Sequence, residues 1–150
     1  MVECGLKERG RYRVLELPGR DTWVAIMRHD HPLSNAACIR SRDLEGVDVV
    51  VARQAWAGAV LRGWTGESYA KMNVAATVNV GTAIVEFVQA GMGVAIGYAE
   101  LIEGLGVEGL VCIPLDPPIY DKRGLMWRKD RILSPAAQAF LRHLESLANT

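Results

Sequence analysis

Apolar residues along the chain fall into short runs that are separated by stretches of helical periodicity. Each run has the length of a β-strand, and strands that alternate with helices are typical of a parallel α/β sheet. The pattern therefore predicts an α/β fold. The runs lie at Thr22–Met27, Val47–Ala52, Met72–Val78, Val94–Gly97, Leu110–Pro114 and Gly124–Arg128.

Three helices are predicted between and after these runs. The stretches Gln54–Trp64 and Thr82–Ala90 carry apolar residues at spacings of three and four, which places them on one helix face. A last helix begins near the C-terminus, because Ser134 offers an N-cap oxygen and Pro135 suits the first helical position. We expect this helix to pack against a sheet through Phe140, Leu141, Leu144 and Leu147.

Two glycines follow the second of these helices. Gly91 is predicted to end the helix in the left-handed conformation, and Gly93 to let the chain turn into the next strand. The segment lacks the third glycine of a dinucleotide-binding fingerprint and follows a helix rather than a strand. At the start of the chain, Met1–Leu6 is expected to be the tail of a strand whose partners are absent.

Length and charge narrow the classes of function. The 150 residues suit one ordinary domain or two small lobes that share strands. Lysine and arginine number 17 and aspartate and glutamate 17, so the formal net charge is zero. A protein that holds nucleic acid through its phosphates carries an excess of positive charge. We therefore expect no direct contact with nucleic acid.

Cysteine usage indicates a reducing compartment. Cys4, Cys38 and Cys112 are odd in number and lack the spacing of a zinc site or a disulfide framework. No N-terminal stretch reads as a secretion signal, and no apolar run is long enough to cross a membrane. We therefore expect a cytoplasmic protein without membrane contact.

Four segments resemble the effector-binding domain of LysR-type transcriptional regulators, over about Gly5 to Leu147. Each motif alone is weak, but the four occur in the family's order and at about its spacing. They are Ala25-Ile-Met-Arg-His-Asp-His-Pro-Leu-Ser, Asp43-Leu-Glu-Gly-Val-Asp-Val-Val-Val, Val88-Gln-Ala-Gly-Met-Gly-Val-Ala-Ile and Leu133-Ser-Pro-Ala-Ala-Gln-Ala-Phe-Leu.

The resemblance implies a type 2 periplasmic-binding-protein-like fold, with mostly parallel sheets in two lobes. Residues 33–120 are expected to form lobe two, and residues 1–32 and 121–150 an incomplete lobe one with the crossover strands Thr22–Arg28 and Gly124–Arg128. The family's helix-turn-helix does not precede Met1, so we expect a fragment that reaches DNA only through a domain absent from it. The family also pairs through effector domains, which implies a homo-oligomer.

The segment from Asn79 to Thr82 is the first candidate binding site. A strand ends and a helix begins there, so unpaired N–H groups, including that of Gly81, and the positive end of the helix dipole favour a carboxylate. The alternative is that Asn79 or Thr82 only caps the helix.

A second candidate lies at the end of another strand, where Arg53 and Gln54 begin a helix. By the resemblance they line the family's cleft, and Arg53 can hold a carboxylate through two parallel hydrogen bonds. The alternative is an exposed arginine at a helix start. Gly97 and Tyr98 are a third candidate, because open α/β sheets bind ligands outside the carboxyl ends of their strands.

Metal and catalytic chemistry find little support. His29 and His31 share one face of an extended segment but need a third ligand from elsewhere, and the resemblance explains them as a turn. No serine sits in a GxSxG elbow, and Cys38 and Cys112 read as a loop residue and a buried strand residue without a histidine nearby. We expect no catalytic residue, metal or cofactor.

The predicted function is the sensing of a small organic anion, expected to be a carboxylate, in a cleft between two lobes. A solute-binding protein or an enzyme of the same fold is the alternative, because a fold alone does not decide function. The first needs an export signal and the second a convergent set of titratable groups. A truncated remnant without function is a third possibility.

Overall fold

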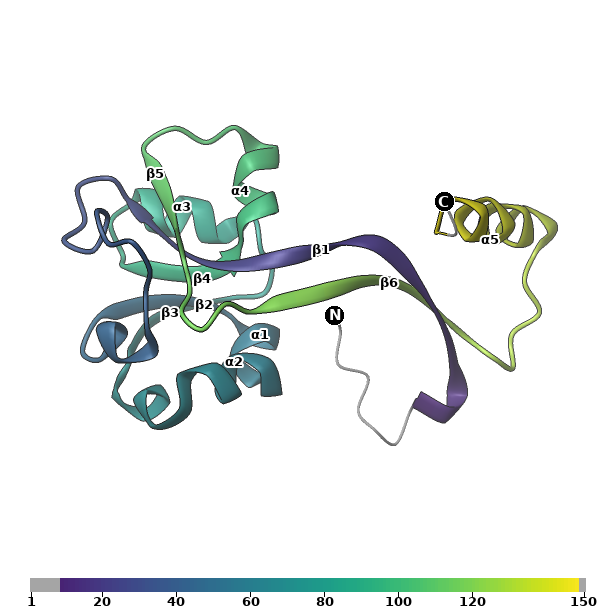
Figure 1. Ribbon diagram of the computed structural model, residues 1–150, viewed down its shortest axis with the longest axis horizontal. Helices are drawn as coiled ribbons and strands as arrows, with labels where there is room; N and C mark the ends of the chain where they lie inside the picture. The colour runs from purple at the N-terminus through teal and green to yellow at the C-terminus, as the bar shows by residue number, and fades with distance from the viewer. Residues whose placement is uncertain (1–8, 149–150) are drawn as a thin grey trace. The chain divides into compact units, whose positions relative to one another are not determined.

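The computed structural model describes residues 9–148, shown in Figure 1. The expected strand tail Met1–Leu6 and Cys4 lie outside the described residues. The strands are β1 (Tyr12–Arg28), β2 (Asp48–Ala52), β3 (Asn73–Val78), β4 (Val94–Tyr98), β5 (Leu110–Pro114) and β6 (Tyr120–Arg128). The helices are α1 (Arg53–Ala57), α2 (Ala59–Thr65), α3 (Ala83–Gln89), α4 (Ala99–Leu105) and α5 (Pro135–Ala148), with the 3-10 helices η1 (Arg9–Arg11), η2 (Ser41–Leu44) and η3 (Gly66–Lys71).

The chain divides into two compact units. Unit 1 comprises Met1–Arg20 and Asp121–Thr150, and unit 2 comprises Asp21–Tyr120. The long strand β1 belongs to both, because it passes from unit 1 to unit 2 between Arg20 and Asp21.

The sheet of unit 2 has the strand order β3-β2-β4-β1-β5. β2 runs parallel to both β3 and β4, as expected for strands joined by helical crossovers. β1 runs antiparallel to β4 and to β5. The parallel arrangement that the sequence predicts therefore holds for three neighbouring strands, and the sheet as a whole is mixed.

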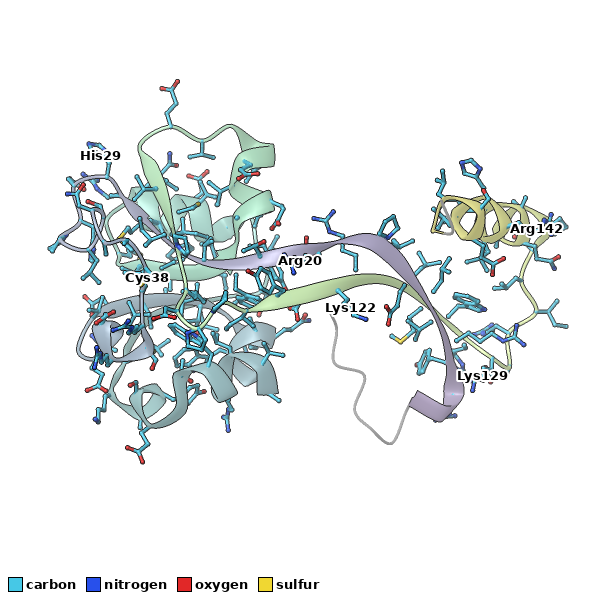
Figure 2. All side chains as sticks on the ribbon, in the orientation of Figure 1. Arg20, His29, Cys38, Lys122, Lys129 and Arg142 are labelled. Carbon is cyan, nitrogen blue, oxygen red and sulfur yellow. The ribbon has the colours of Figure 1, made fainter. Side chains whose placement is uncertain are left out.

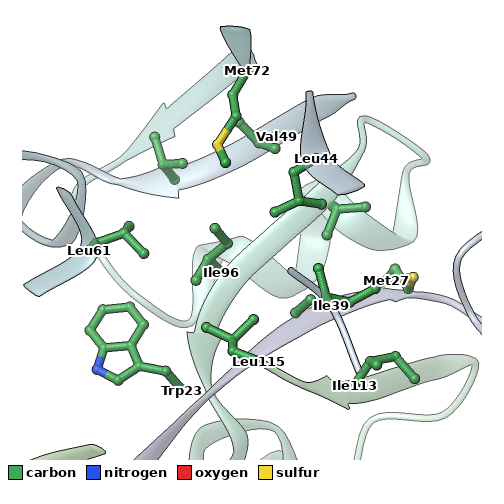
Figure 3. Packing of buried hydrophobic residues seen from close by; sticks show 13 residues of the cluster. Trp23, Met27, Ile39, Leu44, Val49, Leu61, Met72, Ile96, Ile113 and Leu115 are labelled. Carbon is green, nitrogen blue, oxygen red and sulfur yellow. The ribbon is translucent and has the colours of Figure 1, made fainter. Parts of the chain in front are cut away.

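Both faces of this sheet are buried, because successive strand residues alternate between two hydrophobic clusters. Val49 and Val51 face the cluster that also contains Leu61 of α2, while Val50 faces the cluster built on α3 and α4. In β1, Ala25 and Met27 belong to the first cluster and Ile26 to the second. A sheet covered on two faces accounts for continuous apolar runs. Figure 3 shows the first cluster, in which Trp23, Ile39, Leu44 and Ile96 converge.

The helices of unit 2 differ from the predictions in two places. The predicted helix Gln54–Trp64 is split into α1 and α2 by Gly58, whose extended backbone (φ −74°, ψ 150°) cannot continue a helix. α4 was not predicted, because Gly104 within it and Gly106 after it weaken the helical signal. The remaining prediction, Thr82–Ala90, is confirmed as α3.

Helix α3 ends in a Schellman motif, which is formed by two backbone hydrogen bonds. The N–H of Gly91 donates to the carbonyl of Val88 (2.9 Å) and that of Met92 to the carbonyl of Phe87 (3.1 Å). Gly91 has a φ of +79°, so the predicted left-handed helix end is confirmed.

The described part of unit 1 contains a ribbon of two strands, the 3-10 helix η1 and the helix α5. β6 pairs with the first part of β1, and Lys122 forms an ion pair with Glu16 across the ribbon (2.9 Å). Side chains line both strands, with Arg20 and Lys122 labelled in Figure 2. The predicted start of α5 is confirmed, because the N–H of Ala137 donates to Oγ of Ser134 (3.2 Å).

The apolar stripe of α5 is covered less than expected. Phe140 and Leu147 are 54% and 52% exposed, while Leu141 and Leu144 are half-buried. The expectation of close packing against a sheet is therefore not met over the whole stripe. The reason is that the described part of unit 1 offers only the two strands of the ribbon, too few for an extensive apolar face.

Candidate functional site

The carboxyl ends of three strands meet at one edge of the unit 2 sheet. β3, β2 and β4 are neighbours and parallel, so the residues that follow them share this edge. Arg53 and Gln54 begin α1 directly after β2, and Gly97 and Tyr98 end β4. The segment Asn79–Thr82 connects β3 to α3. The structure thus brings the three predicted segments to a common edge, which we call the effector edge.

The side chains at the effector edge are largely polar and accessible. Arg53, Gln54, Asn79 and Thr82 are exposed, whereas Tyr98 is half-buried. Within the described residues, the guanidinium of Arg53 forms no ion pair or side-chain hydrogen bond with the protein. An unpaired guanidinium offers its donors to a planar anion.

The helix starts at this edge contribute less than the sequence suggested. α1 has five residues and α3 seven, so neither carries a substantial helix dipole. The first N–H groups of α3 are also engaged, since Ala83, Ile84 and Val85 donate to carbonyls three residues earlier (3.1–3.2 Å). These three N–H groups therefore do not add to the donors predicted for the segment Asn79–Thr82.

The alternative role of Asn79 and Thr82 as helix caps is also wrong. Thr82 occupies the N-cap position of α3 but makes no side-chain cap hydrogen bond. Its backbone is already helical (φ −64°, ψ −28°), whereas a capping side chain normally accompanies an extended backbone. Both side chains therefore remain available to a ligand.

Sequence reasoning missed Trp23 and Glu100 at the effector edge. β1 is antiparallel to β4, and Trp23 lies opposite Tyr98 in the register of the two strands. Trp23 therefore lies at the end of β4 that belongs to the effector edge. The two rings pack with centroids 4.6 Å apart. Both carboxylate oxygens of Glu100 accept the backbone N–H of Thr22, at 3.1 and 3.0 Å. No local signal reveals these residues, because strand direction depends on partners far away in sequence.

Two adjoining hollows lie at the opposite edge of the same sheet, with volumes of about 430 and 220 Å³. The larger is lined by Asp43 and Asp48 beside the apolar Pro32, Leu33 and Val47. The carboxylates repel anions, so this place does not suit the anionic ligand that the sequence predicts.

His31 takes part in the turn after β1. Its Nδ1 atom accepts the N–H of Leu33 (3.2 Å) and its carbonyl oxygen accepts the N–H of Ser34 (2.9 Å), which agrees with the turn predicted for the segment. His29 instead contacts a segment distant in sequence, because its Nδ1 atom lies 3.1 Å from the carbonyl oxygen of Gly109.

The two described cysteines lie in the predicted loop and the predicted strand, but Cys112 is half-buried rather than buried. Cys38 is in the loop before η2 (Figure 2), and Cys112 is in β5, where burial raises the pKa of its thiol.

Comparison with known proteins decides the family. The sequence model of the family described as "LysR substrate binding domain" matches residues 6–148. The chain belongs to this family. A stretch of 64 residues is also 42% identical to the uncharacterized HTH-type transcriptional regulator YwbI of Bacillus subtilis (strain 168). That stretch covers 42% of this chain and 21% of the relative, so the comparison with this regulator concerns about a fifth of its length.

Solved structures show the same fold for this LysR substrate-binding domain. The effector-binding domain of QuiR in complex with shikimate matches with a TM-score of 0.79 and 16% identity, covering 97% of this chain and 69% of that chain. The regulatory domain of CcmR from Synechocystis PCC6803 in complex with 2-PG matches with a TM-score of 0.77 and 19% identity, covering 93% and 68%. The predicted periplasmic-binding-protein-like α/β fold is thus confirmed.

None of the described helices combines the length and the apolar character that crossing a membrane requires.

Proposed function

We propose that this chain is the effector-sensing part of a LysR-type transcriptional regulator and that its effector edge binds a small carboxylate. The observation that carries the proposal is the meeting of β3, β2 and β4 at one edge, beside the guanidinium of Arg53, which has no partner among the described residues. Ligands of open α/β sheets bind at such edges. The ligands of the structural relatives, shikimate and 2-PG, are small molecules, which supports a ligand of that size.

Each residue of the edge has a distinct part in this proposal. Arg53 pairs with the carboxylate, and the amides of Gln54 and Asn79 and the hydroxyl of Thr82 hydrogen-bond to polar groups of the ligand. Gly81 leaves space beside Leu101, and Tyr98 provides an apolar ring with a polar hydroxyl. Gly97 is buried, and its Cβ position faces Ile26 and Ile84, so its part is to support Tyr98 from the end of β4.

In this proposal unit 2 corresponds to lobe two of the family fold, and unit 1 to part of lobe one. Ligand binding serves transcription by biasing the arrangement of effector domains, as linkage between two sites requires. In this proposal neither unit contacts DNA, and a helix-turn-helix domain makes that contact.

The test is an NMR titration of the full chain with shikimate, succinate and methyl shikimate. We expect the two acids to shift the amide resonances of Arg53, Gly81 and Tyr98, and the ester, which lacks the carboxylate, to bind more weakly. Because Arg53 is exposed, Arg53→Ala should weaken acid binding by about five- to tenfold, which corresponds to roughly 1 kcal/mol.

The matched control is Arg42→Ala, which removes an exposed arginine of η2 near the start of β2 and should leave binding unchanged. Equal binding by wild type and Arg53→Ala, or shifts that map to the hollow around Asp43 and Asp48, would contradict the site.

A further inference from the structure

The first turn of α4 lies directly beside the effector edge. Tyr98 is both the last residue of β4 and the N-cap of α4, and Glu100 follows two positions later. The turn also lies close to the segment after β3, because a Cβ added at Gly81 would lie 3.5 Å from Cδ2 of Leu101, in van der Waals contact. A group that occupies the edge at Gly81 or Tyr98 therefore meets this turn.

The same turn holds β1 at the position where that strand leaves unit 2. Glu100 accepts the N–H of Thr22 with both carboxylate oxygens, and the boundary of unit 2 lies at Asp21, one residue earlier. A hydrogen bond to an ionised acceptor is roughly twice as strong as one between neutral groups.

The segment that leads from unit 2 back to unit 1 is hydrogen-bonded to β1 at the neighbouring residue. The N–H of Trp23 donates to the carbonyl of Ile119 (3.1 Å), and Ile119 immediately precedes Tyr120, the last residue of unit 2. Trp23 in turn packs against Tyr98. Both places where the chain passes between the units are thus connected to the end of β4.

We propose that Glu100 is a positioning residue that transmits the state of the effector edge to β1 through the N–H of Thr22. The proposal rests on the proposed function for the nature of the signal, a ligand at the edge. Its structural basis is independent, because Leu101 lies next to the Cβ position of Gly81 and follows Glu100 in the α4 turn, and Glu100 accepts the N–H of Thr22. If the first turn of α4 moves at Leu101, the hydrogen bonds between the carboxylate of Glu100 and the N–H of Thr22 in β1 change as well.

A ligand-free mutant cycle tests the coupling, with the Thr22 amide in the full chain as the probe. Glu100→Ala should speed hydrogen exchange at Thr22 about tenfold or more, and Glu100→Gln, which keeps an acceptor but no charge, should do so less. Glu103→Ala is the matched control, because it removes an exposed carboxylate from the same helix. It should leave Thr22 unchanged.

The decisive step uses Gly81→Ala, which adds a methyl group against Leu101. We expect this variant to shift the Thr22 amide resonance when Glu100 is present and not in the Glu100→Ala background. The inference is overturned if Gly81→Ala leaves Thr22 unmoved, or moves it equally in both backgrounds.

A second arm adds shikimate to the wild type and to Glu100→Ala. Shifts at Gly81 in both proteins, with a shift at Thr22 only in the wild type, would support the coupling, and equal shifts at Thr22 would contradict it. If shikimate and succinate shift nothing at the edge, the proposed function fails. The mutant cycle still decides the role of Glu100 in that case.

Discussion

The two parts of β1 show how one strand can serve two different environments. From Trp23 to Met27 every residue is buried, whereas Tyr12 to Arg20 contains no buried residue. The buried part is continuously apolar, and the other part mixes Leu15 and Leu17 with charged neighbours. The two parts differ in burial because unit 2 packs helices against both faces of its sheet.

The contrast extends to the two units as wholes. Among the described residues, every buried hydrophobic side chain belongs to unit 2. In unit 1, Val14 is 62% exposed and Phe140 54%. A two-stranded ribbon with one helix buries too little apolar surface to be stable alone. We therefore expect unit 2 to carry most of the stability of the chain.

The largest effect is expected from truncating equivalent aliphatic residues on the two parts of β1. Ile26→Ala removes a side chain with no exposed area and should lower the free energy of unfolding by about 2–5 kcal/mol. Leu15→Ala removes a half-buried side chain and should cost less than about 1 kcal/mol. Urea denaturation measures both values, and equal losses would refute the assignment of stability to unit 2.

The next effect concerns the backbone of unit 2 at Gly93. Its φ is +138°, and a Cβ there would lie 2.1 Å from the carbonyl oxygen of Asp48, so Gly93→Ala should cost about 1–3 kcal/mol or more.

Gly104→Ala is the matched control for this substitution. Gly104 lies in α4 with open space around its Cβ position, so alanine should stabilise the chain by roughly 0.5–1 kcal/mol. Thermal melts of the two variants should therefore move in opposite directions, and a shared direction would contradict the geometry at Gly93.

The strands of unit 2 could be predicted from the sequence because both of their faces are buried. The predicted run Val47–Ala52 differs from β2 by one residue, and Leu110–Pro114 coincides with β5. The early part of β1 was missed, because charged residues and Pro18-Gly19 interrupt its apolar pattern. Where a strand has one partner and open faces, its sequence carries a weak hydrophobic signal.

The candidate site shows a similar limit. Residues after parallel strands could be predicted as neighbours, because helical crossovers determine the direction of β2, β3 and β4. Trp23 and Glu100 required the antiparallel register of β1 against β4, which is set by contacts between distant parts of the chain. The hydrophobic periodicity of a single segment does not predict its register against a strand that is distant in sequence.

Self-association is the third expected effect, and it should depend on unit 1. Phe140 and Leu147 of α5 are more than half exposed, and apolar surface of this kind favours association. We expect light scattering to show a mass that rises with micromolar concentration and that Phe140→Ser with Leu147→Ser reduces. Val80→Ser is the control, since Val80 is 62% exposed in unit 2. A strict monomer for the wild type, or an equal effect of the control, would contradict this role of unit 1.

The smallest effect is expected from two similar ion pairs, one at the end of β1 and one at the end of β6. Arg28 pairs with Asp30 (2.6 Å) and Arg128 pairs with Asp130, in each case two residues along the chain. Both pairs are exposed, so neither contributes much to stability. The two pairs differ in their further hydrogen bonds. Nη1 of Arg28 also donates to the carbonyl of Gln89 (3.1 Å), which is the last residue of α3.

Hydrogen bonding by Arg28 lowers the pKa of Asp30 to about 2, and hydrogen bonding by Arg128 lowers the pKa of Asp130. A carboxyl group whose pKa is lowered by folding stabilises the folded state above its unfolded pKa, which is about 4, and this contribution is lost as the pH falls toward the folded value. Asp30→Asn should therefore lower the urea midpoint slightly at pH 7, and the difference from wild type should shrink between pH 4 and pH 2. Asp130→Asn should lower the midpoint less, because its pair belongs to unit 1, which contains none of the buried hydrophobic side chains among the described residues. A pH-independent effect of Asp30→Asn would show that packing, rather than the charge pair, links the end of β1 to α3.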